Sequence, residues 1–169
     1  MTFRITIGID PGQTGAVAVI ADGAWAGFHD MPTMPRPGGK GLHVNGAALA
    51  EVLRDVLTAP PGADALAVLE EVGAMPKQGV TSTFRFGEGY GVIRGVLGAL
   101  RVPFVTVRPD RWKRDLRLAG LAKDSARTAA IQRFPSAACQ LARKKDGGRA
   151  DALLIAHWAH ATEQIGEAA

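Results

Sequence analysis

Three acidic residues lie where a folded chain could bring carboxylates together. Asp10 follows a run of β-branched residues, Glu70 ends a second apolar run, and Asp151 lies near the start of the last amphipathic segment. In an α/β sheet the side chains at neighbouring strand ends converge on one crevice. Carboxylates repel one another there, and divalent cations remove the repulsion. Mg²⁺ or Mn²⁺ favours such oxygen ligands, and two ions about 3.5–4 Å apart can activate water against a phosphodiester.

Strands and helices are expected to alternate around these residues. Runs rich in β-branched residues predict strands, and apolar residues at helical spacing predict helices. The strands are expected over 3–9, 15–21, 24–30, 65–69 and 103–107, and the helices over 45–57, 81–100, 111–116, 123–134 and 149–163. Hairpin strands followed by strands that alternate with helices indicate a mixed sheet in an α/β fold.

Turn and capping residues set the limits of these elements. Asn45 is expected to cap the helix that follows it, and Thr81 or Ser82 the next one. Residues 31–41 hold three prolines and three glycines and are expected to form a loop. Asp146-Gly147-Gly148 is expected to break the chain before the last helix.

Length and composition favour one domain that spans residues 1–169. The chain has 169 residues, of which 47% are hydrophobic and 21% charged, close to the averages of globular domains. The single cysteine, Cys139, excludes an intrachain disulfide and a multi-cysteine zinc site, and it is expected to be a small buried residue. No apolar run reaches the ~18–20 residues of a membrane span, so we expect a cytoplasmic protein without a membrane partner.

Positive charge is concentrated in one segment. Residues 101–150 carry 13 Lys and Arg against four Asp, which gives +9, whereas the rest of the chain carries −5. Such asymmetry suggests that a polyanion docks beside an acidic pocket, because Lys and Arg that neutralise phosphates release counterions. The alternative is a solvated helical surface.

The helix expected over 81–100 contains an unusual row of glycines. Gly87, Gly91, Gly95 and Gly98 recur at spacings of four, four and three, and each lowers helix stability by about 1 kcal/mol relative to alanine. A smooth row of glycines lets another backbone approach closely. That backbone belongs either to the sheet of the same chain or to a second subunit.

Several motifs together resemble a known family. They are Ile7-Gly8-Ile9-Asp10-Pro11-Gly12 with Thr14-Gly15, then Val68-Leu69-Glu70-Glu71-Val72, then Arg149-Ala150-Asp151-Ala152-Leu153-Leu154-Ile155-Ala156. In this order they resemble the RuvC-type Holliday junction resolvases of the RNase H-like superfamily, including the compact phage-like members. The resemblance spans nearly the whole chain. It implies a mixed five-stranded RNase H-like sheet flanked by helices.

The resemblance also implies an activity and a set of metal ligands. It implies a crossover junction endonuclease that resolves four-way DNA junctions with Mg²⁺ or Mn²⁺, two ions per site, bound by Asp10, Glu70 and Asp151. Many members carry an aspartate or histidine where this chain has Gly148. Asp146 is the candidate for that fourth position, catalytic and metal-binding. Glu71 is a poorer candidate, since neighbours on a strand point to opposite faces.

The DNA contacts and the assembly follow from the same resemblance. Basic residues near the cleaved strand are expected to bind phosphates: Lys113, Lys123, Arg143, Lys144, Lys145 and Arg149. Paired symmetric cuts imply a homodimer, and the family suggests a bacterial or phage-encoded protein. The family places an aromatic wedge shortly after the glutamate. Here either Met75 or the segment through Phe84 and Phe86 would take that place.

Other interpretations remain open at this stage. The chain could be a different RNase H-like nuclease that acts on flaps or RNA–DNA hybrids, or a DNA-binding protein with a degenerate site. The turn from Asp10 to Gly15 also resembles the phosphate loop of sugar kinases, but 169 residues leave little room for their second domain. Trp112 either stacks on a nucleotide or anchors a short helix, and His157 and His160 are expected to pack rather than bind metal.

Overall fold

A computed structural model describes residues 4–58, 64–73, 79–122 and 124–167, with side chains up to residue 162. Five strands form one sheet in the order β3-β2-β1-β6-β7. Their bounds are Arg4–Ile9 (β1), Ala16–Ala21 (β2), Ala24–Asp30 (β3), Asp64–Glu70 (β6) and Phe104–Val107 (β7). Strand β1 pairs antiparallel with β2 and parallel with β6, and β6 pairs parallel with β7. The mixed five-stranded sheet predicted from the sequence is therefore confirmed.

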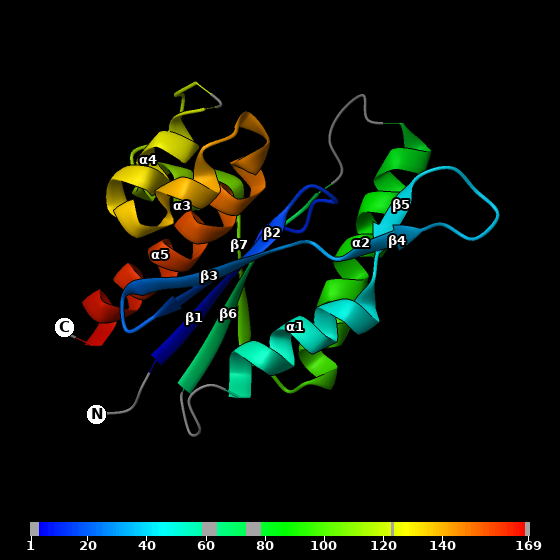
Figure 1. The fold of residues 1–169 in the computed structure, drawn as a ribbon, viewed down its shortest axis with the longest axis horizontal. Coiled ribbons are helices and arrows are strands. Elements are labelled where there is room, and N and C mark those ends of the chain that lie inside the picture. The colour runs from blue at the N-terminus through cyan, green and yellow to red at the C-terminus, as the bar shows by residue number, and fades with distance from the viewer. Residues whose placement is uncertain (1–3, 59–63, 74–78, 123, 168–169) are drawn as a thin grey trace.

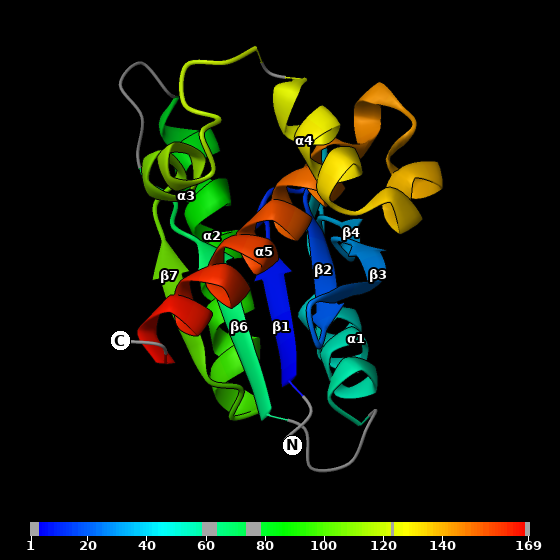
Figure 2. The ribbon, with the colours of Figure 1, turned by 90° about the vertical axis from the view of Figure 1, so that its left-hand side faces the viewer.

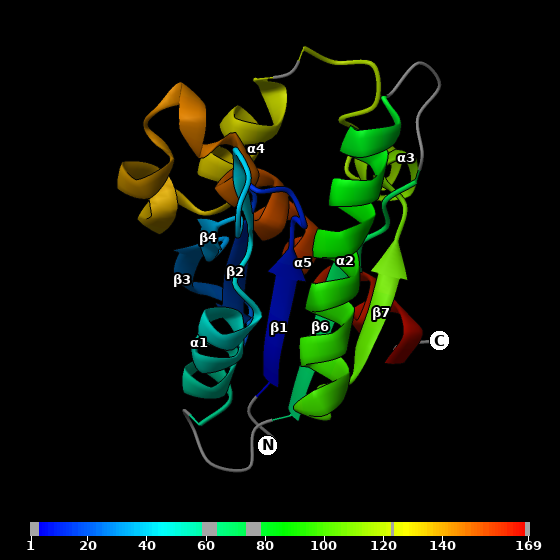
Figure 3. The same ribbon diagram turned by 90° about the vertical axis from the view of Figure 1, so that its right-hand side faces the viewer.

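Helices cover both faces of the sheet (Figure 1). Helix α5 (Gly147–Glu167) crosses one face, in front of β1 and β6 in Figure 2. Helices α1 (Gly46–Thr58) and α2 (Val80–Ala99) cover the other face, which Figure 3 shows. The remaining helical segments are α3 (Pro109–Asp115), α4 (Ser125–Arg133), η1 (Pro135–Leu141) and η2 (Lys144–Asp146). Of these, α4 lies beyond the carboxyl end of β1 (Figure 2).

Strand alternation divides the core into two layers. Ile5, Ile7 and Ile9 of β1 pack in one hydrophobic cluster with residues of α1 and α2. The cluster on the opposite face includes Val68 of β6 together with most of the buried residues of α5. Because side chains alternate along a strand, Asp10 and Glu70 point to the face that α5 covers.

Two expected features of the chain are modified by the structure. The predicted loop over 31–41 contains one strand of a small antiparallel hairpin, β4 (Thr33–Pro35) with β5 (Leu42–Val44). Asn45 caps α1 as predicted, since its Oδ1 accepts a hydrogen bond from the backbone N–H of Ala48 at 3.1 Å. The predicted cap of α2 is wrong, because Gly79 holds the N-cap position and Thr81 lies inside the helix.

Two further expectations about local structure are wrong. Gly147 and Gly148 do not break the chain, because they form the first turn of α5. Cys139 is exposed rather than buried. No helix in the described part of the chain is long and apolar enough to cross a bilayer.

The glycine row of α2 faces away from the rest of the chain. Gly87, Gly91, Gly95 and Gly98 are exposed, and an added Cβ at any of them would meet no atom within 4 Å. The buried positions of α2, which include Ile93 and Leu97, face the core instead. The prediction that the row packs against the chain's own sheet is therefore wrong, and a second subunit is the alternative.

Candidate active site

The structure brings Asp10, Glu70 and Asp151 to one end of the sheet, and we call them the convergent carboxylates. Ile9 pairs with Leu69 in the parallel register of β1 and β6, so Asp10 and Glu70 follow at the same level of adjacent strands. Burial, together with the negative charges of Asp10 and Asp151, raises the pKa of Glu70 to about 7, although a hydrogen bond from Trp112 opposes the rise. The three carboxylates thus lie close enough to interact electrostatically.

Close approach of α5 to β1 depends on a glycine in the strand. A Cβ at Gly8 would overlap the carbonyl oxygen of Ala152 and lie 2.6 Å from the backbone nitrogen of Ala156. Only a residue without a side chain allows this approach of helix to strand. Since Ala152 follows Asp151 directly, the same contact fixes the position of Asp151 above the end of β1.

A second glycine seats the first turn of α5 on the β1–β2 loop. A Cβ at Gly148 would overlap the carbonyl oxygen of Thr14 and lie 3.2 Å from Oδ2 of Asp10. Gly148, which occupies the position of the family's fourth ligand, therefore lies in a close backbone contact. Any side chain there requires the loop or the helix to move.

The loop itself holds Asp10 in a defined orientation. The backbone N–H of Asp10 donates to the carbonyl of Ala16 at 3.0 Å, and its Oδ1 accepts from the N–H of Gly12 at 3.2 Å. Burial raises the pKa of Asp10, whereas the Gly12 hydrogen bond and the charge of Lys113 oppose this rise. A half-buried carboxylate of this kind favours the binding of a cation.

Trp112 has a role that sequence reasoning missed. Its ring is fully buried, and its Nε1–H donates to Oε1 of Glu70 at 2.9 Å. The ammonium group of Lys113 lies 5.0 Å from the centre of the same ring, and its charge lowers the pKa of both Asp10 and Glu70. Trp112 therefore anchors α3 and orients Glu70, and it is not available for stacking on a nucleotide.

A groove of about 690 Å³ opens beside two of the convergent carboxylates. Its lining residues are Asp10, Thr14, Asp124, Ala126, Arg127, Lys144, Lys145, Gly147, Gly148 and Asp151. Lys144 and Lys145, two of the predicted DNA contacts, thus lie in the same groove as Asp10 and Asp151. A groove lined by both carboxylates and basic side chains suits a phosphodiester held over bound cations.

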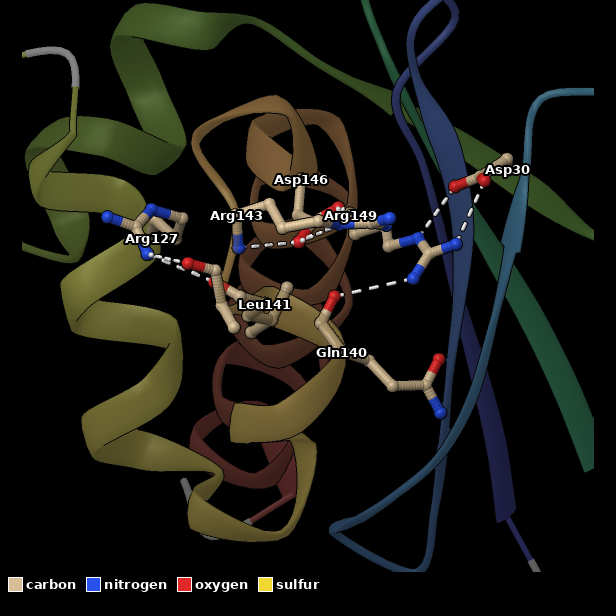
Figure 4. A network of polar contacts seen from close by, with 8 residues as sticks. Asp30, Arg127, Gln140, Leu141, Arg143, Asp146 and Arg149 are labelled. Carbon is tan, nitrogen blue, oxygen red and sulfur yellow. Dashed lines mark hydrogen bonds and ion pairs between the residues drawn. The ribbon is translucent and has the colours of Figure 1, made fainter.

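Asp146 lies in an ion pair instead of with the convergent carboxylates (Figure 4). Its side chain is only 3% exposed, and its Oδ1 lies 2.8 Å from the guanidinium NH2 of Arg143. The backbone N–H of Arg143 donates to Oδ2 of Asp146 at 2.8 Å. These hydrogen bonds hold the pKa of Asp146 below its usual range.

Arg149 is held in a similar way. Its Nε and NH2 donate to the two oxygens of Asp30 at 2.6 and 2.8 Å, and NH1 donates to the carbonyl of Gln140 (Figure 4). Arg127 likewise bonds both oxygens of Asp124 and the carbonyl of Leu141. We call the three arginine-bound carboxylates, Asp30, Asp124 and Asp146, the paired carboxylates.

The other predicted residues are placed as follows. Lys123 and Met75 lie outside the described residues, and Glu71 is exposed directly after the end of β6. His157 packs edge-on against Phe134 with ring centres 5.4 Å apart. Within the part of the chain that the structure describes, no three His, Cys, Asp or Glu side chains form a group that could already hold one metal ion.

The order of the sheet, with α5 crossing β1 near the convergent carboxylates, defines an RNase H-like fold. No family model matches the chain. Over 128 residues it is 38% identical to the chloroplastic Holliday junction resolvase MOC1 of Chlamydomonas reinhardtii. The aligned segment covers 70% of this chain and only 14% of that protein.

Solved structures identify the fold more closely. RuvC of Thermus thermophilus in complex with a Holliday junction substrate superposes with a TM-score of 0.66 at 19% identity, over 96% of each chain. A further structure of Thermus thermophilus RuvC gives a TM-score of 0.57 at 16% identity, over 96% of this chain and 97% of that chain. The chain has the RuvC fold, and the resemblance predicted from the sequence is confirmed.

Proposed function

We propose that this chain is a metal-dependent endonuclease that cleaves branched DNA, with four-way junctions as the preferred substrate. The observation that carries the proposal is the convergence of Asp10, Glu70 and Asp151 beside a groove lined by basic residues. The similarity to a chloroplastic Holliday junction resolvase supports the same substrate class. In this proposal the described residues act as one nuclease domain.

The donor set of the site suits a hard divalent cation. All three convergent side chains offer carboxylate oxygens, and burial together with mutual repulsion disfavours their charged forms in the absence of a cation. We therefore assign Asp10, Glu70 and Asp151 as ligands of Mg²⁺ or Mn²⁺, two ions per site. Bound there, the ions would activate water and stabilise the leaving oxygen of a phosphodiester. Asp146 could join this set only after its ion pair with Arg143 opened.

Other residues of the chain would orient the metal ligands or bind the phosphates of the DNA. Trp112 fixes one oxygen of Glu70. Lys113, beside Asp10 and Glu70, is proposed to contact the phosphate of the cleaved strand. Lys144 and Lys145 extend that contact along the groove. Arg143 and Arg149, whose side chains bind carboxylates in the free protein, would contribute mainly by holding the start of α5.

Paired incision of a junction requires two active sites, so we propose a two-fold homodimer. The exposed glycine row of α2 offers the contact surface. Two more exposed apolar residues, Val80 and Phe84, lie in the first turns of the same helix, with 87% and 75% of their surface accessible. Phe84 is also the better candidate for the wedge in the junction, because Phe86 is half-buried.

Cleavage assays with three substrates test the activity. Purified protein is incubated with a synthetic four-way junction, a flap and an RNA–DNA hybrid, with Mg²⁺ or with EDTA. We expect paired cuts in the junction, and none in EDTA. Faster cleavage of the flap or the hybrid would mean that this substrate, and not the junction, is the preferred one. Binding of the junction without cleavage in either Mg²⁺ or Mn²⁺ would leave a DNA-binding protein and refute the nuclease.

A bulky residue in the glycine row tests the dimer. Since Gly91 faces open space in the single chain, Gly91→Leu should fold normally, yet it should overfill a close contact between subunits. We expect a monomer by sedimentation, with a normal circular dichroism spectrum, that nicks junctions without paired incision. A wild-type chain that stays monomeric with junction bound would refute the dimer.

A further inference from the structure

Of the three paired carboxylates, Asp124 alone lines the groove of the proposed active site. Its side chain is 55% exposed, whereas that of Asp146 is 3% exposed. Lys144 and Lys145 line the same groove, so a negative charge lies among side chains that are proposed to bind phosphate. A carboxylate repels phosphate, and yet Asp124 lies where the DNA backbone is proposed to pass.

Arg127 binds Asp124 with one edge of its guanidinium group and the backbone with the remaining nitrogen. Nε lies 2.8 Å from Oδ1 of Asp124, and NH2 lies 2.6 Å from Oδ2. NH1 donates to the carbonyls of Leu141 and Ala142 at 3.1 and 3.3 Å (Figure 4). The side chain is only 20% exposed. The backbone thus fixes the guanidinium group, and its edge with two donors is presented to an anion in the groove.

A phosphate fits the edge that Asp124 occupies. The arginine fork binds carboxylates and phosphates through the same pair of parallel N–H···O hydrogen bonds. Lys144 adds positive charge at the same place, since its charge and that of Arg127 both lower the pKa of Asp124. Two cations therefore face one carboxylate, and the local charge attracts a phosphodiester.

Asp124 also has a second group of donors within its reach. It holds the N-cap position of α4, but its side chain makes no capping hydrogen bond. Aspartate is among the best N-cap residues, because its carboxylate accepts from the first backbone N–H groups of a helix. Capping requires an extended backbone, whereas Asp124 has helical angles, φ −82° and ψ −7°. A rotation of its own backbone would therefore let a carboxylate released from Arg127 cap α4.

We propose that Asp124 occupies a phosphate subsite in the free protein, and that one phosphate of the bound DNA displaces it from Arg127. The inference rests on the proposed nuclease function, because it takes the groove as the path of the strand. In the free protein Asp124 is structural, like the other paired carboxylates. When DNA binds, Asp124 caps α4, and Arg127 keeps its hydrogen bonds to the backbone of η1 and the residue after it. The Asp124–Arg127 pair is thus an internal competitor of DNA.

A neutral residue at position 124 separates this role from a purely structural one. If Asp124 competes with phosphate, removal of its charge tightens DNA binding. If Asp124 only fixes α4, the same change weakens binding or leaves it unaltered. Asp124→Asn removes the charge and keeps a good N-cap residue, so α4 should stay folded by circular dichroism. The control, Asp110→Asn, neutralises an exposed carboxylate that also binds an arginine, at 3.0 Å, but lies outside the groove.

Equilibrium binding of a synthetic four-way junction in EDTA measures the effect. We expect Asp124→Asn to bind about two- to fivefold more tightly than wild type, the equivalent of one exposed ion pair. Asp110→Asn should bind like wild type. Equal or weaker binding by Asp124→Asn would overturn the proposal. An equal gain in both variants would also overturn it, because the gain would then come from net charge alone.

Single neutral methylphosphonate linkages, placed in turn along the strand around the cut, locate the phosphate. At one position we expect the gain of Asp124→Asn to disappear, because an uncharged linkage neither displaces a carboxylate nor is repelled by it. Arg127→Gln, which lacks the positive charge, should bind the junction more weakly and should be insensitive to the neutral linkage at that position. A gain that persists equally at every position would overturn the exchange.

These measurements need no cleavage, so they separate this inference from the nuclease proposal. Cleavage of the junction by wild type in Mg²⁺ is recorded for the same preparation. Unchanged binding by Asp124→Asn, in a chain that cuts junctions, would overturn the exchange and leave the nuclease standing. A gain confined to one linkage, in a chain that binds junctions without cutting them, would support the exchange and refute the nuclease. A wild-type chain that binds no junction would refute both.

Discussion

Two groups of carboxylates lie at the same end of this molecule and differ in what neutralises them. Each paired carboxylate is bound by an arginine of the chain, and that hydrogen bond is the main reason why its pKa is lowered. In Asp10 and Glu70 burial prevails, and the pKa is raised. Charge that the chain itself neutralises holds elements together, whereas buried charge that it leaves repelling is suited to an external cation. The first group is therefore structural, and the second is proposed to be functional.

Loss of a convergent carboxylate should have the largest effect. Asp10→Asn keeps the side-chain size but removes a proposed metal ligand, so we expect junction cleavage to fall roughly a thousandfold or more. The matched variant, Asp30→Asn, removes a paired carboxylate that is 70% exposed. It should retain cleavage within a few-fold and lose at most about 1 kcal/mol of stability. Single-turnover rates and chemical denaturation measure both.

An equal loss of junction cleavage in Asp10→Asn and Asp30→Asn would contradict the distinction between the two groups. In that case, the Asp30–Arg149 pair would belong to the catalytic machinery. Cleavage by Asp10→Asn at the wild-type rate would also contradict it, because the convergent group would then have no role in metal binding.

The contributions of the two groups to the stability of the fold should depend on pH in opposite directions. The pKa of Glu70 is about 7 in the folded protein and about 4.5 in the unfolded chain. Between these values the folded state binds more protons, so metal-free protein loses stability as pH rises from about 4.5 to about 7. This single group contributes a loss of about 3 kcal/mol.

Denaturation of wild type and Glu70→Gln in EDTA at pH 4.5 and pH 8 measures this loss. Relative to wild type, the variant should gain about 3 kcal/mol between the two pH values. Mg²⁺ should reduce the gain, because the cation stabilises the ionised form. Paired carboxylates, whose pKa is lowered, act the other way: their contribution is lost only as pH falls through their folded pKa, below the ordinary value of 3.8. Equal pH dependence of wild type and variant would contradict the assignment of Glu70.

Removing an arginine should convert a paired carboxylate into an unpaired one. Arg143→Ala leaves Asp146 buried with the backbone N–H of residue 143 as its remaining contact from this partner. We expect a loss of about 1–3 kcal/mol in unfolding free energy at pH 7. The control, Arg108→Ala, breaks an exposed pair with Asp110 and should cost about 0–1 kcal/mol.

A second variant, Asp146→Asn, tests whether Asp146 binds metal. If its carboxylate serves only to hold α5, Asp146→Asn should lower stability and keep Mg²⁺-dependent cleavage. Loss of cleavage comparable to that of Asp10→Asn, in a variant that stays folded, would instead place Asp146 among the ligands and end its assignment to the paired group.

The convergent group could be predicted from sequence because each member follows from a local pattern. Asp10 follows a strand rich in β-branched residues, Glu70 ends an apolar strand, and Asp151 lies near the start of an amphipathic helix. The paired group could not be predicted as a whole, although Asp124 and Asp146 lie only three residues from Arg127 and Arg143. Asp30 and Arg149 are 119 residues apart, and no periodicity connects them. Trp112 and Glu70 are 42 residues apart, and their hydrogen bond depends on how α3 docks.

Glycines caused the clearest errors, for a physical reason. Low helix propensity made Gly147-Gly148 indicate a break, yet close packing on Thr14 requires the absence of a side chain there. Tertiary contact thus overrides propensity. The β4–β5 hairpin escaped prediction because three-residue strands beside prolines carry no alternating pattern.

Two tryptophans each donate a hydrogen bond to a carboxylate, one convergent and one bound by an arginine. Nε1–H of Trp112 donates to Glu70 at 2.9 Å, and Nε1–H of Trp158 donates to Asp115 at 3.0 Å. Asp115, like the paired carboxylates, is also bound by an arginine, Arg111. Both hydrogen bonds lower the pKa of their acceptor. The two contacts share the same donor and differ in the acceptor and in burial, since the Trp112 hydrogen bond is partly buried and the Trp158 hydrogen bond is exposed.

Replacement of each tryptophan by phenylalanine removes the donor and keeps an aromatic ring. In Trp112→Phe the pKa of Glu70 should rise further, so a smaller fraction is ionised at a given pH, and the acidic limb of the pH–rate profile should move to higher pH with a few-fold loss near pH 7. Trp158→Phe should lower stability and leave that profile unchanged, because Arg111 still binds Asp115 and Asp115 binds no metal in this proposal. Rates at saturating Mg²⁺ from pH 6 to pH 9 distinguish the two. Equal shifts would mean that loss of packing explains both, and the distinction between neutralised and convergent carboxylates would not extend to the residues that hold them.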